Sequence, residues 1–395
     1  MTYGCGKTTA LLAGLVLTTF LHLATAETYE CTIGKLEYGE GEFCIFRNVS
    51  YSAKSTASIG FKTPGNSVQT RIAFEESELD HLPKEFLSKF GKDMRVLHVV
   101  RCKLQSVVIT NAMEELFATD NYIEKVIVHQ QSGSSPIKSI HLQSNRLEDV
   151  SNITRNCKNV TILDLSRNEL LSKDSVINLG MFNGLNQLEY LLLADVGALY
   201  LDYDNLPNLP SLTLLDLSMN NLLPSDLQVD KLSVLENLRV LRFNDIGFAQ
   251  LDYAHLTQMK SLKQVYLEGN SFDCVYLVDM INFLNEKGIE TPVARPATVC
   301  STGFKVEKQM CCKSSDLGVP IKTTKPITTH GSTHKPASEL NEVYTSKTTE
   351  TMPTMKTTGS AEMKPKTSSG NGVSKVTINF SCILVGLALA KLSSF

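Results

Sequence analysis

Cysteine is the residue type in this chain whose number and spacing point most clearly to chemistry. The chain has ten cysteines, of which Cys5 and Cys382 lie in terminal segments that we expect to be removed. The remaining eight are Cys31, Cys44, Cys102, Cys157, Cys274, Cys300, Cys311 and Cys312. An even number of cysteines in an exported chain predicts disulfides. A zinc site is the alternative, but no C-x2-C pair and no histidine pair at ligand spacing occurs, so we expect no metal or cofactor.

The order of these eight cysteines suggests how they pair. The first two precede the repeats described below and should bridge each other. The last four follow the repeats. Because the final two are adjacent and rarely bond each other, each should pair with one of the other two, in either connectivity. Cys102 and Cys157 can pair only if the chain brings their Cα atoms within about 7 Å. Otherwise Cys157 is a free thiol available to another chain.

The sequence shows no pattern of catalytic residues. Gly4-Cys5-Gly6-Lys7-Thr8 looks like part of a phosphate-binding loop, but that motif needs a glycine where the chain has Met1, and a strand before it. There is no nucleophile elbow, and the scattered histidines have no partner pattern. The formal net charge is only −3, so nothing suggests nucleic acid. We therefore expect a binding protein rather than an enzyme.

The first 26 residues predict export. Lys7 supplies a positive charge, and residues 10–23 form an apolar run of the length found in signal peptides. Ala24-Thr25-Ala26 places small residues where signal peptidase cleaves, so Glu27 should begin the mature chain. A transmembrane helix is the alternative, but it needs about 20 apolar residues. We expect residues 1–26 to be a signal peptide.

The other end of the chain predicts attachment to a membrane. Residues 314–372 are rich in Thr, Ser, Pro and Lys, which predicts a disordered, O-glycosylated stalk. Residues 373–395 form an apolar tail without a basic flank, preceded by small residues. This order is typical of a glycosylphosphatidylinositol (GPI) anchor signal, with Ser368, Ser369 and Gly370 as candidate attachment residues. The alternative is a single membrane span of about 17 residues. Either would hold the chain at the outer face of the plasma membrane.

A repeat with the pattern L-x-x-L-x-L-x-x-N-x-L occupies residues 67–273. Residues 137–147, 160–170, 212–222 and 262–272 are the clearest copies, and weaker copies surround Ile72, Leu97, Leu116, Leu191 and Leu241. The fourth positions then fall at residues 72, 97, 116, 140, 163, 191, 215, 241 and 265, at steps of 19 to 28 residues. About nine copies at this spacing predict an α/β leucine-rich-repeat solenoid, a horseshoe of stacked turns with a parallel concave sheet.

The residue types of the repeat pattern reflect which side chains each turn must bury. Each copy supplies a short strand whose positions four and six face the core, while positions three, five and seven face out. The ninth-position asparagine should turn inward and bond to backbone groups that have no sheet partner. In two copies Val196 and Ile246 take this position, each followed by a glycine, and there we expect the apolar side chain to fill the core. Because repeat arrays need covered ends, we expect cysteine caps at residues 27–66 and 274–313, the second with a helix near 275–285.

Two runs of sequence carry a resemblance to a known family. They are NCKNVTILDLSRNEL at 156–170, and LEGNSFDC at 267–274 with Cys300 and the double cysteine after it. With the N-terminal cysteine pair, these make residues 27–313 resemble the mosquito leucine-rich-repeat immune proteins. Soluble members of that family continue into a coiled coil, form disulfide-linked pairs and hold a complement-like thioester protein. This chain has no heptads after the double cysteine, and no cysteine near Val128 to match the one that pairs with the counterpart of Cys157 in relatives. It resembles a short, membrane-anchored member without the coiled coil.

The concave sheet of a solenoid is its usual binding surface. Positions three and five of consecutive copies carry side chains that we expect to be exposed there and to form a protein-contact patch, unless loops or glycans cover them. The predicted patch consists of Ile162, Tyr190, Leu192, Leu214, Val240, Tyr266, His141, Asp164, Asp216 and Arg242, with His98 nearby. The sequons at Asn48, Asn152 and Asn159 predict N-glycosylation.

These features together predict an extracellular, protein-binding leucine-rich-repeat protein. The resemblance implies innate-immune recognition or scaffolding of a complement-like factor, with a thioester protein or another leucine-rich-repeat protein as partner. A non-immune cell-adhesion or matrix-interaction protein of the same fold is the alternative.

Overall fold

The structure is a computed structural model that describes residues 27–36, 39–54, 58–64, 70–129 and 134–314. The chain divides into two compact units, Met1–Ile321 and Lys322–Phe395, of which the second lies outside the described residues. The predicted signal peptide, the apolar tail and all but the first residue of the predicted stalk also lie outside them.

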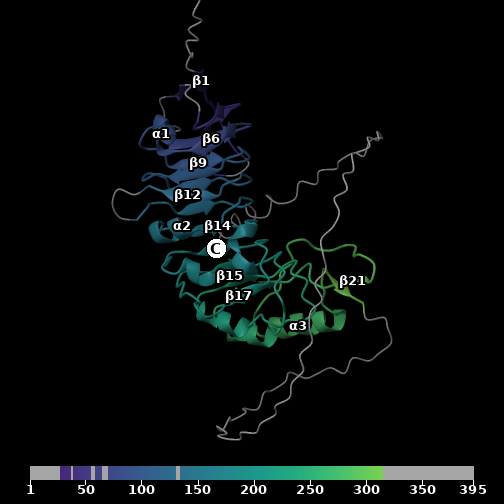
Figure 1. Ribbon diagram of the computed structural model, residues 1–395. Helices are drawn as coiled ribbons and strands as arrows, with labels where there is room; N and C mark the ends of the chain where they lie inside the picture. Colours follow the sequence, from purple (N-terminus) through teal and green to yellow (C-terminus); the bar gives the residue numbers. More distant parts are fainter. Residues whose placement is uncertain (1–26, 37–38, 55–57, 65–69, 130–133, 315–395) are drawn as a thin grey trace, which may run out of the picture. The chain divides into compact units, whose positions relative to one another are not determined.

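An 11-stranded sheet runs through the described part of the chain. Its strand order follows the sequence (Figure 1), with β2 antiparallel to β3 and each later pair parallel. The strands are β2 (Thr32–Gly34), β3 (Phe43–Arg47), β6 (Arg71–Glu75), β9 (Val96–Val99), β11 (Glu115–Phe117), β13 (Ser139–His141), β14 (Ile162–Asp164), β16 (Tyr190–Leu192), β18 (Leu214–Asp216), β19 (Val240–Arg242) and β20 (Gln264–Tyr266). Since every turn of the chain adds the next parallel strand, the turns are stacked as in a solenoid.

The register of this sheet confirms the predicted repeat. The nine predicted fourth positions pair in register from Ile72 to Val265 without a slip, and Cys44 precedes them in the same row. Each of the nine side chains is 0% exposed, so this row is the centre of the shared core. The fold is an α/β leucine-rich-repeat solenoid.

Shorter elements connect the strands of the main sheet. Three of them, β8 (His81–Leu82), β10 (Ser106–Ile109) and β12 (Lys125–Val128), form a second parallel sheet. The remaining strands form the pairs β1 (Glu27–Glu30) with β5 (Ile59–Lys62), β4 (Ser50–Tyr51) with β7 (Glu78–Leu79), β15 (Val176–Asn178) with β17 (Tyr200–Asp202), and β21 (Phe304–Glu307) with β22 (Met310–Lys313). The helices are α1 (Lys84–Leu87), α2 (Ser151–Asn156) and α3 (Cys274–Glu286), with 3-10 turns η2 (Ser88–Phe90), η3 (Glu169–Leu171), η4 (Lys173–Ser175), η5 (Leu179–Phe182), η6 (Val229–Val234) and η7 (Tyr253–Gln258).

The ninth-position asparagines form the predicted internal ladder. The amide of Asn168 donates to the carbonyls of Leu142, Leu165 and Ser166, and its Oδ1 accepts from the N–H of Leu147 at 3.0 Å. The same side chain-to-backbone pattern recurs at Asn121, Asn145, Asn220 and Asn270. Each of these asparagines is buried, so it satisfies backbone groups that water cannot reach.

The turns at Val196 and Ile246 lack such an asparagine. Both side chains are buried, as predicted, and the glycines that follow have φ of 75° and 89°. The asparagine of the next turn bonds to these turns as it does elsewhere: Oδ1 of Asn220 accepts from the N–H groups of Val196 and Ala198, and Oδ1 of Asn270 accepts from those of Gly247 and Phe248. A turn without an asparagine therefore keeps the acceptor that the next turn supplies and lacks only the bonds of its own side chain.

A left-handed residue stands before the ninth position in every repeat, which the sequence analysis did not predict. The residues with positive φ at this place are Glu76, Arg101, Asp120, Ser144, Arg167, Asp195, Met219, Asp245 and Gly269. Only one is a glycine and three are aspartates, which adopt this conformation more readily than most residues, whereas Glu76, Arg101 and Met219 have no such local preference. The stacked turns impose it on side chains that ordinarily avoid it.

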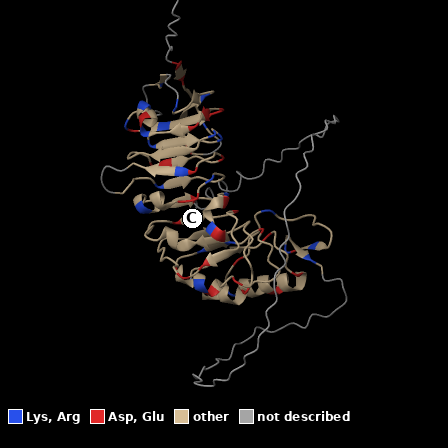
Figure 2. Cartoon of the chain, in the orientation of Figure 1, with Lys and Arg blue, Asp and Glu red and all other residues tan. Residues whose placement is uncertain are grey.

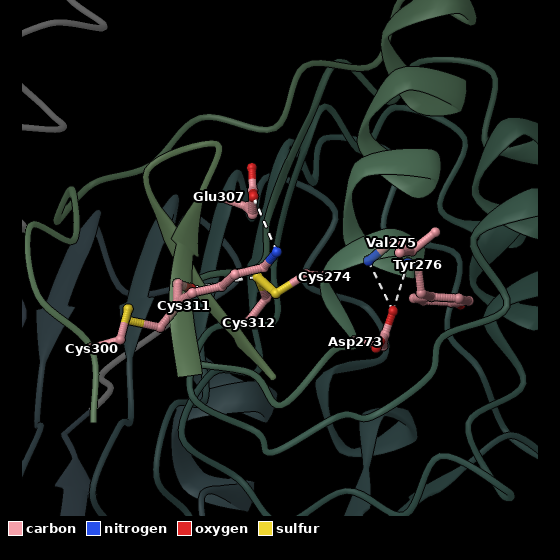
Figure 3. Close-up of a disulfide and its surroundings, with 9 residues drawn as sticks. Asp273, Cys274, Val275, Tyr276, Cys300, Glu307, Cys311 and Cys312 are labelled. Atoms are coloured by element: carbon pink, nitrogen blue, oxygen red, sulfur yellow. Dashed lines mark hydrogen bonds and ion pairs between the residues drawn. A yellow bond between two sulfur atoms is a disulfide. The ribbon is translucent and has the colours of Figure 1, made fainter. Parts of the chain in front are cut away.

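Disulfides close both ends of the solenoid. Cys31 bonds Cys44, as predicted. At the other end the sequence did not decide how the four cysteines pair, and the structure has the disulfides Cys274–Cys312 and Cys300–Cys311 (Figure 3). The predicted helix is α3, which begins after Asp273, whose carboxylate accepts from the N–H groups of Val275 and Tyr276.

Cys102 and Cys157 do not pair. Both are free thiols, and both side chains are 0% exposed. Of the two alternatives left open by the sequence, the free thiol holds and the bridge does not, but the burial of Cys157 keeps it from being available to another chain. Burial raises the pKa of each thiol to about 12, so neither ionises at neutral pH.

Candidate binding face of the sheet

The open face is the side of the main sheet that points away from the core, from β13 to β20. Side chains alternate along a strand, so positions three and five of each repeat point to this side. Register pairs arrange them in two rows. The position-three row is Ser139, Ile162, Tyr190, Leu214, Val240 and Gln264, and the position-five row is His141, Asp164, Leu192, Asp216, Arg242 and Tyr266. The structure thus brings all ten predicted patch residues onto one face.

The side chains of this face are much less exposed than predicted. None of the ten predicted residues is exposed; five are half-buried, and the other five are 1% to 8% exposed. The buried five are His141, Asp164, Leu192, Leu214 and Asp216. Neighbouring strands lie only about 4.8 Å apart, so side chains in a row cover each other's flanks. The face is therefore a closely packed surface and not the exposed apolar row that was predicted.

The N-terminal cap covers the earlier part of the same side of the sheet. Phe43, Ile45, Ala73 and Val96 hold positions three and five of the first turns and form a small second apolar cluster there. Leu36 from the cap packs on this cluster. A partner can therefore reach the sheet only beyond these turns, which is where the open face begins.

Two histidines mark the boundary between the covered and the open part. His98 lies between the rings of Phe43 and Phe117, at 6.1 and 5.8 Å, and His141 stacks on Phe117 at 4.6 Å. Burial lowers the pKa of each histidine to about 4, so both are uncharged at neutral pH. Nε2 of His141 is bonded to the Ser139 hydroxyl at 2.8 Å, whereas the ring nitrogens of His98 have no hydrogen-bond partner.

Charged groups lie on the open face among the apolar ones. Oδ2 of Asp216 is 3.4 Å from a guanidinium nitrogen of Arg242, whose guanidinium lies over the ring of Tyr266 at 5.2 Å. Asp164 is 1% exposed, and burial raises the pKa of its carboxyl to about 6. In Figure 2 charged positions of both signs are interspersed along the ribbon.

Buried polar atoms without a hydrogen-bond partner gather on this side of the sheet. Within the described residues they belong to Arg71, His98, Arg242, Asn244 and Glu268. All five residues stand at positions three, five or seven, which point away from the core. Arg71 and His98 lie beside Phe43 in the part that the N-terminal cap covers, whereas Arg242, Asn244 and Glu268 belong to the last two turns of the open face. Buried polar groups are ordinarily bonded, so these three indicate a place where another molecule can supply bonds. Arg71, Asn244 and Glu268 are not among the predicted patch residues, although a polar residue at position seven was the available signal for the last two.

The C-terminal cap limits the open face at its other end. Oε2 of Glu268 accepts from the N–H of Ala294 at 3.0 Å, and the guanidinium of Arg295 is 2.8 Å from Oδ2 of Asp245 and 4.0 Å from Oε1 of Glu268. Burial raises the pKa of Glu268. The loop after α3 thus packs beside the last turn and leaves about six strands between the two caps.

The three predicted glycosylation residues hold no position in the two rows. Asn48 and Asn152 are exposed, whereas Asn159 is half-buried and its amide donates to the carbonyl of Ser135 at 2.8 Å. Asn159 is therefore the least accessible of the three. Glycans at the other two positions would leave the rows of the open face uncovered.

The described part of the chain contains no cluster of His, Cys, Asp and Glu that could hold a metal ion. Within the same residues, no helix has the length and apolar character needed to cross a membrane.

Comparison with known proteins finds similarity over about half of the chain. No protein-family model matches it. Over 192 residues, 48% of the chain, it is 26% identical to the zebrafish (Danio rerio) transforming growth factor beta activator LRRC33. The match covers only 26% of that protein, so the chain spans about a quarter of this relative.

Solved structures with similar folds are also leucine-rich-repeat domains. The domain of APL1B is 20% identical and matches 65% of this chain and 78% of its own, with a TM-score of 0.42. The LRIM1 domain is 18% identical and matches 73% and 95%, with a TM-score of 0.43. The LRIM1/APL1C complex is 17% identical and matches 73% and 72%, with a TM-score of 0.34. Likeness at this level says nothing about what this chain binds.

Proposed function

We propose that the chain is an extracellular leucine-rich-repeat protein whose open face binds a protein partner at the surface of a cell. The observation that carries the proposal is the set of unbonded, buried polar atoms of Arg242, Asn244 and Glu268 on the same face as the apolar rows. Half-buried Ile162, Tyr190 and Val240 supply apolar contact area, and the polar atoms supply directional bonds. This combination is typical of protein-binding surfaces.

Three disulfides support an extracellular location, since such bonds persist in oxidising compartments. We propose a signal peptide at residues 1–26, the two caps and repeats at 27–313, a stalk at 314–372, and an apolar tail at 373–395. We propose that a GPI anchor replaces the tail, and a single membrane span is the alternative. Release of the protein from intact cells by phosphatidylinositol-specific phospholipase C supports the anchor, and retention supports the span.

The finer role that we propose is innate-immune recognition or scaffolding of a complement-like factor. The resemblance of the caps and repeats to the mosquito family favours it, and makes a thioester protein or another leucine-rich-repeat protein the first partner to test. A non-immune adhesion or matrix role would use the same curved binding surface, so the identity of the partner distinguishes the immune role from the adhesion role.

Site-specific photo-cross-linking of the full chain on cells tests the proposed function. A photoreactive amino acid replaces Tyr190 on the open face, and Tyr200 on β17 serves as the matched control, because it is also a tyrosine and is 39% exposed. We expect a discrete cross-linked protein from position 190 and none from position 200. The proposal fails if position 190 yields no product, or if both positions yield the same one.

A further inference from the structure

Two turns of the open face carry the same short motif but differ in one neighbour. Asp164-Leu165-Ser166 begins at the last residue of β14, and Asp216-Leu217-Ser218 begins at the last residue of β18. In both, an aspartate Oδ1 accepts from the N–H of the serine two residues on, at 3.1 and 3.0 Å. The backbone of the motif therefore holds each carboxylate in the same way, and the Ser166 hydroxyl adds a bond to Asp164, so a charged second partner has to come from outside the motif.

At Asp216 the next turn supplies that second partner. Arg242 is its register neighbour on β19, and a guanidinium nitrogen lies 3.4 Å from Oδ2. At Asp164 the register neighbour on β16 is Leu192, which cannot pair with a carboxylate. Asp164 forms no ion pair with any described residue that the structure brings within 4 Å.

The other groups around Asp164 do not supply a cation either. His141, its neighbour on β13, is uncharged at neutral pH because burial lowers its pKa to about 4. Arg167 attracts the carboxylate, but its Nε lies 3.9 Å from Asp195. Asp216 repels it across β16. A carboxylate that is 1% exposed and lacks a cation is unusual, because buried charges are ordinarily paired.

We propose that Asp164 receives the side chain of a lysine or arginine from a protein partner that lies along the open face. The inference rests on the proposed function, which it makes more specific. Leu192 fills the register position that Arg242 takes beside Asp216, so the incoming cation would approach Asp164 from the outer side of the sheet. Leu192, Tyr190 and Ile162 surround this approach with apolar surface, so the basic residue of the partner should be flanked by apolar residues.

A second observation on the same face also calls for hydrogen-bond donors from the partner. Oδ1 of Asn244 and Oε1 of Glu268 are buried acceptors without a hydrogen-bond partner, and Glu268 is only 5% exposed. They stand at position seven of the last two turns, on the side to which Asp164 points. Two of the three unbonded buried atoms on the last two turns are therefore acceptors and the third, Nε of Arg242, is a donor, so a donor-rich segment matches the open face better than an acidic one.

Selection from a phage-displayed library of 12-residue peptides on the intact chain tests the proposal. We expect the enriched peptides to share a lysine or arginine beside apolar residues. The best peptide should lose at least tenfold in affinity for Asp164→Asn, an isosteric variant that keeps an oxygen for the Ser166 N–H. Replacing its basic residue by norleucine should weaken binding to the wild type but not to Asp164→Asn. Glu236→Gln, at an exposed carboxylate outside the two rows, is the matched control and should bind as the wild type does.

Two further measurements separate the possible failures. Tyr190→Glu disrupts the open face itself, and a thermal melt of each variant checks its folding. If the peptides bind Asp164→Asn normally but not Tyr190→Glu, the face binds proteins and only the basic residue is wrong. If they bind every variant equally, or if none is enriched, the proposed function fails as well. Lowering the pH from 7 to 5 should weaken binding to the wild type but not to Asp164→Asn, because the pKa of Asp164 is about 6.

Discussion

Replacing Asn220 with alanine tests the internal ladder that holds the turns together. Asn220 is 0% exposed, and its amide donates to the carbonyls of Leu193, Leu217 and Ser218. Its Oδ1 accepts from the N–H groups of Val196 and Ala198, at 3.1 and 3.2 Å. It therefore serves its own turn and the preceding one, which has no asparagine.

The magnitude follows from the two donors that lose their acceptor. A buried N–H left without a partner costs about 1–3 kcal/mol, so two of them cost on the order of 2–6 kcal/mol. We expect Asn220→Ala to lower the free energy of unfolding by about 4 kcal/mol. Asn221→Ala changes the same residue type one position on, where the side chain is exposed, and should change stability by about 0.5 kcal/mol or less.

Urea unfolding with the disulfides intact, followed by far-ultraviolet circular dichroism, measures the difference. The chain has no tryptophan, so circular dichroism is preferable to intrinsic fluorescence. Hydrogen exchange gives a local measurement, because the amide protons of Val196 and Ala198 should exchange faster in Asn220→Ala. Equal unfolding midpoints for the two variants, or unchanged exchange at both amides, would refute the account of the ladder.

Three other predictions concern buried groups. The pKa of His98 is about 4 in the folded chain and about 6.5 in the unfolded chain. The folded state is therefore favoured fully above pH 6.5, and this stabilisation of about 3 kcal/mol is lost as the pH falls through 4. His98→Phe should therefore lose that much less stability than the wild type between pH 7 and pH 4 in urea titrations, and parallel pH profiles would contradict this. The two free thiols should resist N-ethylmaleimide in the native chain and react in guanidinium chloride, as measured by mass spectrometry; native labelling would show that they are accessible. Gly269→Ala should lower the melting temperature more than Gly247→Ala, because an added Cβ would meet Oδ1 of Asp245 at 1.8 Å in the first case and nothing within 4 Å in the second; equal melting temperatures would count against this.

The core of this fold was predictable because the same positions are buried in every repeat. Each fourth-position side chain must fill the same shared interior, so its identity is restricted in every turn and the pattern can be read from one sequence. Asn168 and Val196 could be assigned inward for the same reason. The left-handed residues could not, since Glu76, Arg101 and Met219 have no local preference for positive φ, and only the stacked turns impose it.

The pairing of the last four cysteines depended on an element that the sequence did not reveal. Cys311 and Cys312 are neighbours on β22, which pairs with β21 in an antiparallel hairpin. Successive side chains of a strand point to opposite faces, so the two cysteines cannot reach the same partner. Cys312 is 0% exposed and bonds Cys274 at the start of α3, while Cys311 points to the other side and bonds Cys300. The periodicity of the repeats carries no information about this hairpin.

The chemistry of the open face depends on pairs of turns rather than on single ones. Asp164 and Asp216 occupy the same position in copies with the same local motif, and the repeat pattern alone treats them as equivalent. They differ because the next strand presents Leu192 in one case and Arg242 in the other. Because the strands pair in register, Asp216 has a cation beside it and Asp164 has none. The surface properties of a solenoid should therefore be read across its rows, from each residue to its neighbour in the next turn, and at Asp164 that reading predicts the charge of the partner.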